Sequence, residues 1–142
     1  PSALSEHGLA GTLPSLADEI ENQYDLAVDL RCEVASGDRF SSLLERTAYW
    51  IVQEALVNAG RHAETGTAHV TVREDEHRLC LRVSDEGVGF DPSRQEGDKS
   101  FGIEGIRRRV ERLNGTFKIE TAPGEGACLR VVIPLSVSSV PR

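Results

Sequence analysis

The segment from Glu54 to His62 constrains this chain most, because it places polar side chains in a stretch with the spacing of a packed helix. At 3.6 residues per turn, Glu54, Asn58 and His62 follow one another along one side of a helix and Arg61 lies beside them. The segment also carries an apolar face of helical spacing, formed by Leu43, Leu44, Ala48, Ile51, Val52, Ala55 and Ala59. The pattern predicts a helix that packs on a core and turns a polar stripe towards a ligand. The alternative is a surface helix whose polar side faces only water.

The size and composition of the chain favour one globular domain. The chain has 142 residues, of which 39% are hydrophobic and 27% charged, as is ordinary for a soluble domain. No apolar run approaches the roughly 20 residues of a membrane span, so we expect no membrane contact from this segment. A formal net charge of −7 argues against a nucleic-acid surface. A nucleotide can still bind, provided that backbone amides and Mg²⁺ meet its phosphate charge.

The first residue and the cysteines bear on the origin of the chain. It begins at Pro1 and contains no Met, so we expect it to be a piece of a longer protein. Cys32, Cys80 and Cys128 form no CxxC pair, and their odd number favours free thiols in a reducing compartment. We therefore expect a cytoplasmic domain, whether or not the parent protein is anchored in a membrane.

Hydrophobic periodicity predicts an α+β domain. Helical spacing covers residues 8–21, 42–62 and 102–113, and period-two spacing covers residues 26–34, 69–73, 79–84, 117–119 and 129–133. We expect a mixed, mostly antiparallel sheet with helices on one face. Ser42 and Glu45 have the spacing of a capping box, and Asn114-Gly115 that of a helix C-cap. We expect a linker at 1–7, the domain at 8–135, a flexible loop at 90–100 and a disordered tail at 136–142.

Two glycine motifs follow the central helix. Asp85-Glu86-Gly87-Val88-Gly89 comes directly after an expected strand, where an Asp can accept a hydrogen bond and glycines let the backbone approach a flat ligand. The same letters fit an ordinary turn equally well. Gly102 and Gly105 open an expected helix, whose free N–H groups and positive dipole end suit an anion. The alternative is that these two glycines only allow close helix packing.

Taken in this order, the segments strongly resemble the ATP-binding catalytic domain of sensor histidine kinases, which shares the Bergerat fold with gyrase, Hsp90 and MutL. Glu54-x-x-x-Asn58-Ala-x-x-His62-Ala63 resembles the N box, Asp85-x-Gly87-x-Gly89 the G1 box and Gly102-x-x-Gly105 the G2 box. The resemblance covers roughly residues 8–135 and implies a two-layer α/β sandwich. The amino-acid sequence of residues 52–58 and 102–106 is most similar to that of kinases that signal to NarL-type response regulators.

The resemblance implies a role for each motif. Asn58 would present its carbonyl oxygen to Mg²⁺, and Asp85 would accept from the exocyclic amine of adenine. Guanine has a carbonyl oxygen at that edge, so Asp85 would select ATP over GTP, since an unmade buried bond costs about 1 to 3 kcal/mol. Gly87 and Gly89 would let the chain pass the base.

The resemblance also implies a phosphate side. The helix start from Gly102 through Ile103 to Gly105 would contact the phosphates, and Glu54 would be the base or polarising carboxylate. Further phosphate charge would be met by three basic side chains: Arg61, His62 and Lys99. One departure concerns the base side, because relatives usually carry Thr where this chain has Ala127.

The partners follow from a second departure. A histidine kinase phosphorylates a His of a separate dimerisation domain, and this chain lacks the acceptor motif; His7 has no following acid and fits a linker better. We expect the fragment to be monomeric, the parent to be a homodimer and the acceptor domain to lie upstream. The alternatives are a serine kinase of the anti-sigma type with the same fold and a non-catalytic module whose lid closes on ATP to present a binding surface.

Overall fold

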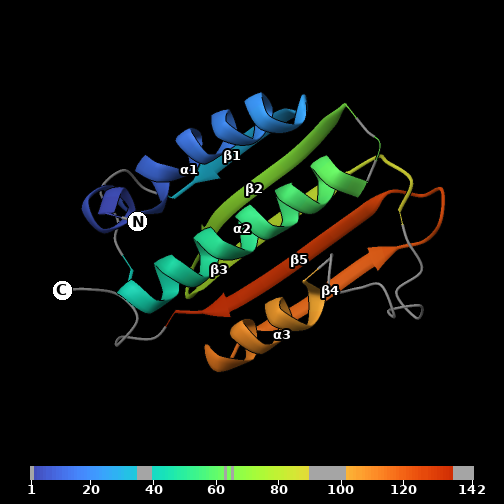
Figure 1. Ribbon diagram of the computed structural model, residues 1–142. Coiled ribbons are helices and arrows are strands. Elements are labelled where there is room, and N and C mark those ends of the chain that lie inside the picture. Colours follow the sequence, from blue (N-terminus) through green and yellow to red (C-terminus); the bar gives the residue numbers. More distant parts are fainter. Residues whose placement is uncertain (1, 35–39, 63, 65, 90–101, 136–142) are drawn as a thin grey trace.

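The described residues form a five-stranded sheet with helices on one face (Figure 1). The computed structural model describes residues 2–34, 40–62, 64, 66–89 and 102–135. The elements are α1 (Ser2–Tyr24), β1 (Ala27–Glu33), α2 (Ser42–His62), β2 (Thr67–Asp75), β3 (Arg78–Asp85), α3 (Ile103–Arg112), β4 (Thr116–Thr121) and β5 (Ala127–Pro134). The strand order is β1-β2-β3-β5-β4, in which β1 and β2 are parallel and the other neighbours antiparallel. The predicted α+β sandwich is confirmed. The expected loop at 90–100 and the tail at 136–142 lie outside the described residues.

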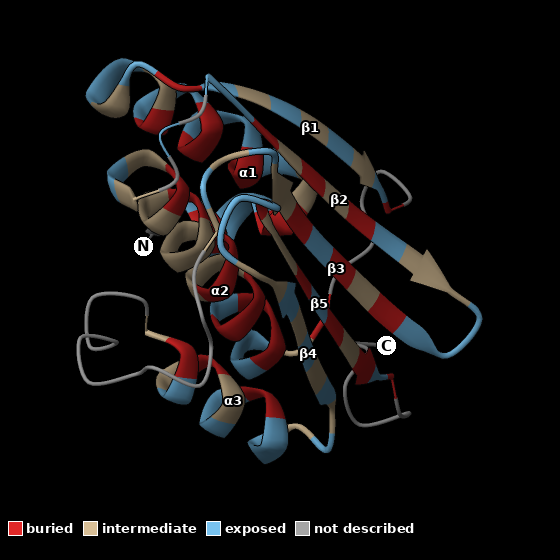
Figure 2. Cartoon of the chain, turned by 90° about the vertical axis from the view of Figure 1, so that its right-hand side faces the viewer, coloured by how far each residue is buried: buried red, intermediate tan, exposed pale blue. Residues whose placement is uncertain are grey.

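The core lies between the sheet and the three helices, as the buried residues in Figure 2 show. Strands β2 and β3 bury every second residue, as their alternating sequence requires. Helix α2 places Ala48, Ile51, Val52 and Leu56 against this face, each at most 1% exposed. Burial of one such aliphatic side chain contributes about 1.5 to 3 kcal/mol, so α2 is held mainly by its apolar face.

The first helix is longer than its spacing predicted. We expected it to begin near residue 8, but α1 begins at Ser2 and kinks at Gly8, which has φ 70° and ψ −172°. Leu4, before the kink, is 2% exposed in the core, and Thr12 Oγ1 donates to the carbonyl oxygen of Ala3 at 3.4 Å. Residues 2–7, the expected linker, therefore form the first part of α1. A glycine at the kink can adopt the backbone angles that redirect the helix.

The predicted capping box of Ser42 and Glu45 is wrong, because the cap of α2 is one residue earlier and Glu45 bonds outside the helix. Ser41, rather than Ser42, is the cap, and its Oγ accepts a hydrogen bond from the N–H of Leu44 at 3.2 Å. Glu45 Oε2 accepts from the N–H of Phe40 at 3.2 Å, outside the helix. These two bonds satisfy amide groups that have no partner inside a helix end, a contribution of about 1 kcal/mol for the serine cap.

The end of α3 follows its predicted cap. Asn114 has a φ of 59°, and the N–H of Gly115 donates to the carbonyl oxygen of Val110 at 3.0 Å. The turn directs the chain straight into β4. No helix within the described part of the chain has the length and apolar character that a membrane crossing needs.

Candidate nucleotide-binding site

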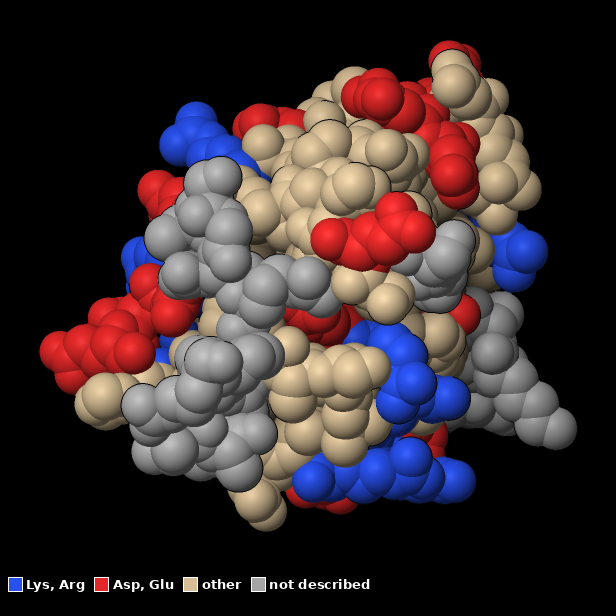
Figure 3. Space-filling view, turned by 90° about the vertical axis from the view of Figure 1, so that its left-hand side faces the viewer, with Lys and Arg blue, Asp and Glu red and all other residues tan. Residues whose placement is uncertain are grey.

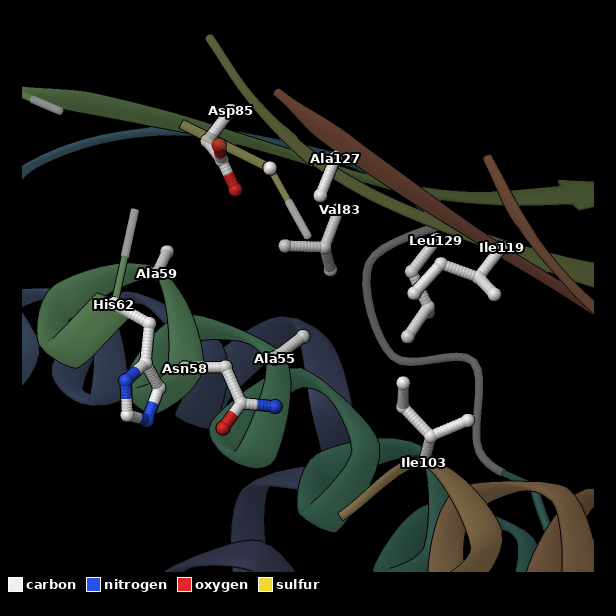
Figure 4. Close-up of a pocket in the computed structure, with 11 residues that line it drawn as sticks. Ala55, Asn58, Ala59, His62, Val83, Asp85, Ile103, Ile119, Ala127 and Leu129 are labelled. Atoms are coloured by element: carbon white, nitrogen blue, oxygen red, sulfur yellow. The ribbon is translucent and has the colours of Figure 1, made fainter. Parts of the chain in front are cut away.

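A cavity of about 540 Å³, counted out to its open mouth, lies between α2 and the sheet. One wall comes from α2, the opposite wall from β3, β4 and β5, and Ile103 at the start of α3 lies at one end (Figure 4). The lining residues are Ala55, Asn58, Ala59, His62, Val83, Asp85, Gly89, Ile103, Ile119, Ala127 and Leu129. Most of this lining is apolar, so its few polar groups determine what can bind there.

Asp85 is the acid of the sheet wall, and Figure 4 shows its carboxylate directed into the cavity. Its Oδ1 accepts a hydrogen bond from the N–H of Gly87 at 2.9 Å, and the N–H of Ala127 donates to the same carboxylate. Burial raises the pKa of Asp85, and these two hydrogen bonds only partly oppose that rise. Asp85 is thus an oriented acceptor at the edge of an apolar slot.

The polar residues of α2 point to two different places, the cavity and the start of α3. Asn58 and His62 line the cavity with Ala55 and Ala59, and the Asn58 Oδ1 and His62 Nε2 atoms are buried. Glu54 is directed elsewhere: its Oε2 lies 3.0 Å from the position that a Cβ on Gly102 would occupy, at the start of α3. Glu54 lies on the same side of α2 as Asn58 but one turn earlier, about 6 Å along the helix axis, which is where α3 begins.

Three of the predicted site residues do not line the cavity or lie outside the described part of the chain: Arg61, Lys99 and Gly87. Arg61 is exposed and is absent from the cavity lining, while Lys99 lies outside the described residues. Gly87 also does not line the cavity, although its N–H orients Asp85. Contacts of Arg61 and Lys99 with phosphate remain predictions.

Gly89 is required by close backbone packing. It has a φ of 63°, and a Cβ there would overlap the carbonyl oxygen of Ala122 and lie 2.7 Å from that of Gly126. Gly126, with a φ of 70°, has no room for a Cβ either, because the carbonyl oxygen of Asp85 occupies it. The turn between β4 and β5 therefore holds the loop after β3 in place, and the two glycines are its contact points.

The two glycines at the start of α3 have different roles. Gly102 is the N-cap, with φ 62° and no side-chain cap hydrogen bond. Gly105 lies under a side chain of α2: a Cβ there would be 3.4 Å from both Trp50 Cη2 and Arg109 Nη1. Only Gly102 has the conformation that favours glycine, whereas Gly105 fits the alternative of close helix packing. Ile103 between them is 5% exposed and lines the cavity.

The sequence analysis missed the apolar wall opposite α2. Val83, Ile119 and Leu129 form it, with Ala127 beside Asp85. Strand periodicity contained part of the signal, because Val83 precedes Asp85 by two residues and so shares its face of the sheet. The contribution of Ile119 depends on the pairing of β4 with β5, which only the tertiary structure supplies.

Ala127, the departure noted in the sequence, pairs with Asp85 across β3 and β5. On the other side, Ala127 pairs with Thr121 of β4. Thr121 Oγ1 donates to the carbonyl oxygen of Gly126 at 2.7 Å. A hydroxyl thus lies on the neighbouring strand and stabilises the turn that contacts Gly89.

The donor set fits a nucleotide with magnesium better than a protein-bound metal centre. The described residues contain no group of three or more His, Cys, Asp or Glu side chains that could hold a metal ion. Mg²⁺ commonly takes few protein ligands and keeps water and phosphate oxygens. The amide oxygen of Asn58 is a ligand of the kind that Mg²⁺ accepts, and the apolar slot with one acid suits a purine base.

Comparison with known proteins agrees with this geometry. Residues 43–137 match the model of the family described as histidine kinase-, DNA gyrase B- and HSP90-like ATPase. The signal transduction histidine-protein kinase/phosphatase DegS of Brevibacillus brevis is 32% identical over 94% of this chain and 34% of its own length. The oxygen sensor histidine kinase NreB of Staphylococcus carnosus is 30% identical over 96% of this chain and 39% of its own length.

Solved structures show the same fold. The histidine kinase domain of the blue-light activated kinase from Erythrobacter litoralis superposes with a TM-score of 0.70 at 20% identity, covering 96% of this chain and 70% of that chain. The kinase AdeS of Acinetobacter baumannii gives 0.68 at 13% identity, covering 89% and 64%. The chain spans little more than a third of the curated relatives named above. The family model matches most of the chain, and the chain therefore belongs to the histidine kinase-, DNA gyrase B- and HSP90-like ATPase family.

Proposed function

We propose that this chain is the ATP-binding catalytic part of a sensor histidine kinase, which transfers the γ-phosphoryl group of ATP to a histidine on a separate dimerisation domain. The observation that carries the proposal is Asp85, a single oriented acid at the edge of an apolar slot, opposite Asn58 of α2. The family implies ATP, and DegS and NreB are histidine kinases by name. The parent protein would be a cytoplasmic or membrane-anchored homodimer that signals to a NarL-type response regulator, and the isolated domain a monomer in the cytoplasm.

On the base side, Asp85 accepts a hydrogen bond from the exocyclic amine of adenine. The methyl groups of Val83, Ile119 and Leu129 exclude water from the face of the base. Exclusion of water strengthens the hydrogen bond to Asp85, because water no longer competes for the acceptor. Guanine would place a carbonyl oxygen against Asp85, and its binding would leave a buried acceptor unpaired.

On the phosphate side, Asn58 would hold Mg²⁺ by its amide oxygen. Mg²⁺, when bound, neutralises phosphate charge and orients the terminal phosphoryl group for in-line transfer. The N–H groups at the start of α3, from Gly102 onward, and His62 would contact phosphate oxygens. Glu54, beside Gly102, would polarise the attacking histidine of the acceptor domain.

The test is phosphotransfer in trans. The purified chain is mixed with a dimerisation domain that bears the acceptor histidine, γ-labelled ATP and Mg²⁺. We expect label on that domain that is lost in acid and kept in alkali, as a phosphorylated histidine requires. An acid-stable label on a serine of a partner would support the anti-sigma-type kinase instead. ATP binding without transfer to any domain would support the non-catalytic module.

A further inference from the structure

A second concavity, remote in its lining from the nucleotide cavity, lies between the first half of α2 and α3. It measures about 950 Å³ out to its open mouth. Its lining combines three large apolar residues with three arginines and three uncharged polar residues: Leu43, Trp50 and Leu113; Arg46, Arg109 and Arg112; and Thr47, Tyr49 and Gln53. It shares no described lining residue with the nucleotide cavity.

The apolar residues of the groove, Leu43, Trp50 and Leu113, are at least partly exposed to solvent. Leu43 is 46% exposed, although it lies on the otherwise apolar side of the helix sequence, and it is one of two large hydrophobic residues in the described part of the chain that are exposed. Trp50 is only partly buried, and the guanidinium carbon of Arg109 lies 3.8 Å from the centre of its ring. Partly exposed Trp and Arg in a groove are the residue types that most often anchor protein partners.

The charge of the groove is opposite to that of the whole chain. The formal net charge is −7, yet none of the described residues that line the groove is Asp or Glu. Figure 3 shows Lys and Arg side chains gathered beside uncharged surface at the lower right of that face, with a few acidic atoms among them and larger groups of Asp and Glu elsewhere. A local positive field on an acidic protein selects an acidic partner and speeds its encounter.

Tyr49 also lines the groove, and burial first, then the charge of Glu19 of α1, raise the pKa of its phenol. The positive charges of the lining are on Arg46 of α2 and on Arg109 and Arg112 of α3. The carboxylates of a partner would be attracted to these three guanidinium groups.

We propose that the groove between α2 and α3 binds an amphipathic helix of a protein partner, with apolar residues on Leu43, Trp50 and Leu113 and carboxylates towards Arg46, Arg109 and Arg112. The two walls are helices, so a third helix can pack its ridges into the groove between them. A strand has no sheet edge to pair with at this place, because the strands of the described chain lie on the other side of these helices.

The test uses two synthetic peptides of about 20 residues, a length at which designed helices form in water. Both carry Leu at helical spacing on one face, and their flanking positions are Glu in one peptide and Lys in the other. Trp50 is the only Trp in the chain, so its fluorescence reports occupation of the groove directly. We expect the Glu peptide to change Trp50 emission and to bind roughly tenfold to a hundredfold more tightly than the Lys peptide.

A charge-reversal variant tests whether the arginines determine which peptide binds. The double variant Arg46→Glu/Arg112→Glu should bind the Lys peptide more tightly than the Glu peptide, while its ATP affinity stays unchanged. Arg108→Glu is the matched control, because Arg108 is exposed on the same helix but does not line the groove. Equal affinity for the two peptides, an equal loss in the control, or tighter binding of duplex DNA than of the Glu peptide would overturn the proposal.

Discussion

The two sides of the nucleotide cavity differ in how firmly the described residues build them. On the side proposed for the base (the base side), Asp85 accepts hydrogen bonds from two backbone N–H groups, and Gly89 and Gly126 each pack against the other's loop. On the side proposed for the phosphates (the phosphate side), Gly102 begins α3 without a side-chain cap, and Glu54 lies beside it. The base side is preformed by the sheet, whereas the phosphate side offers helix-end amides that a ligand can satisfy. We therefore expect that substitutions can weaken base recognition and phosphate binding separately.

The largest expected effect is on the stability of the base side. Gly89→Ala combines a positive φ with an overlap of the Ala122 carbonyl oxygen, so we expect a loss of about 3 kcal/mol or more in the free energy of unfolding. Gly124→Ala is the matched control, since Gly124 has a φ of 82° but no atom within 4 Å of its added Cβ. The control should lose only about 1 to 2 kcal/mol in urea denaturation. Equal losses would show that the interlock contributes nothing.

The second effect concerns base recognition. Asp85→Asn presents an amide to the adenine amine, and we expect ATP affinity to fall by roughly 100-fold in calorimetry. The free protein should become more stable at neutral pH, because the variant removes a carboxylate whose pKa burial raises. Asp75→Asn, an exposed acid paired with Arg78, serves as the control. Unchanged ATP affinity in Asp85→Asn would remove Asp85 from the base site.

The third effect tests the phosphate side. Asn58→Ala removes the amide oxygen proposed for Mg²⁺, so the tenfold or so by which we expect Mg²⁺ to strengthen ATP binding should disappear. Affinity in the presence of a chelator should stay as in the unchanged protein. The measurement is an ATP titration with and without Mg²⁺. A Mg²⁺ dependence that persists would contradict the proposed role of Asn58.

The smallest effect is a pH dependence with opposite signs for stability and binding. Burial raises the pKa of Asp85 above its ordinary value of 3.8, so folding favours the protonated form. Its contribution to stability is complete below pH 3.8 and is lost as the pH rises through the raised pKa. If the carboxylate of Asp85 accepts from adenine as proposed, ATP affinity should fall as the pH falls through that same range. A calorimetric pH series checks this, and Asp85→Asn should show neither trend.

The elements of the fold were predictable from periodicity, and the places where the prediction was wrong have local causes. We expected the first helix to begin near Gly8, but α1 extends from there back to Ser2 across a kink at Gly8. Leu4, in this first part, packs in the core. The cap of α2 is Ser41, and Glu45 bonds to the N–H of Phe40, a contact outside the helix that no i to i+3 pattern encodes.

The sequence predicted those site residues that a motif or a helical stripe within a single element reveals. Asp85, Asn58 and His62 were identified from motif and stripe, and they do line one cavity. The apolar wall, the contact of Gly105 with Trp50 and the direction of Glu54 depend on how separate elements pack. Such contacts leave no periodic trace in the sequence, since the residues that meet are far apart in the chain.

The alternation of β5 has a practical consequence for labelling. Ala127 faces the nucleotide cavity, so the next residue, Cys128, lies on the opposite face of the sheet, which the helices do not cover. Its thiol is free and partly exposed. A small environment-sensitive dye on Cys128 would lie behind the sheet wall of the cavity without entering the cavity. With Cys32 and Cys80 replaced by Ser, one such dye would make the domain its own optical sensor for ATP.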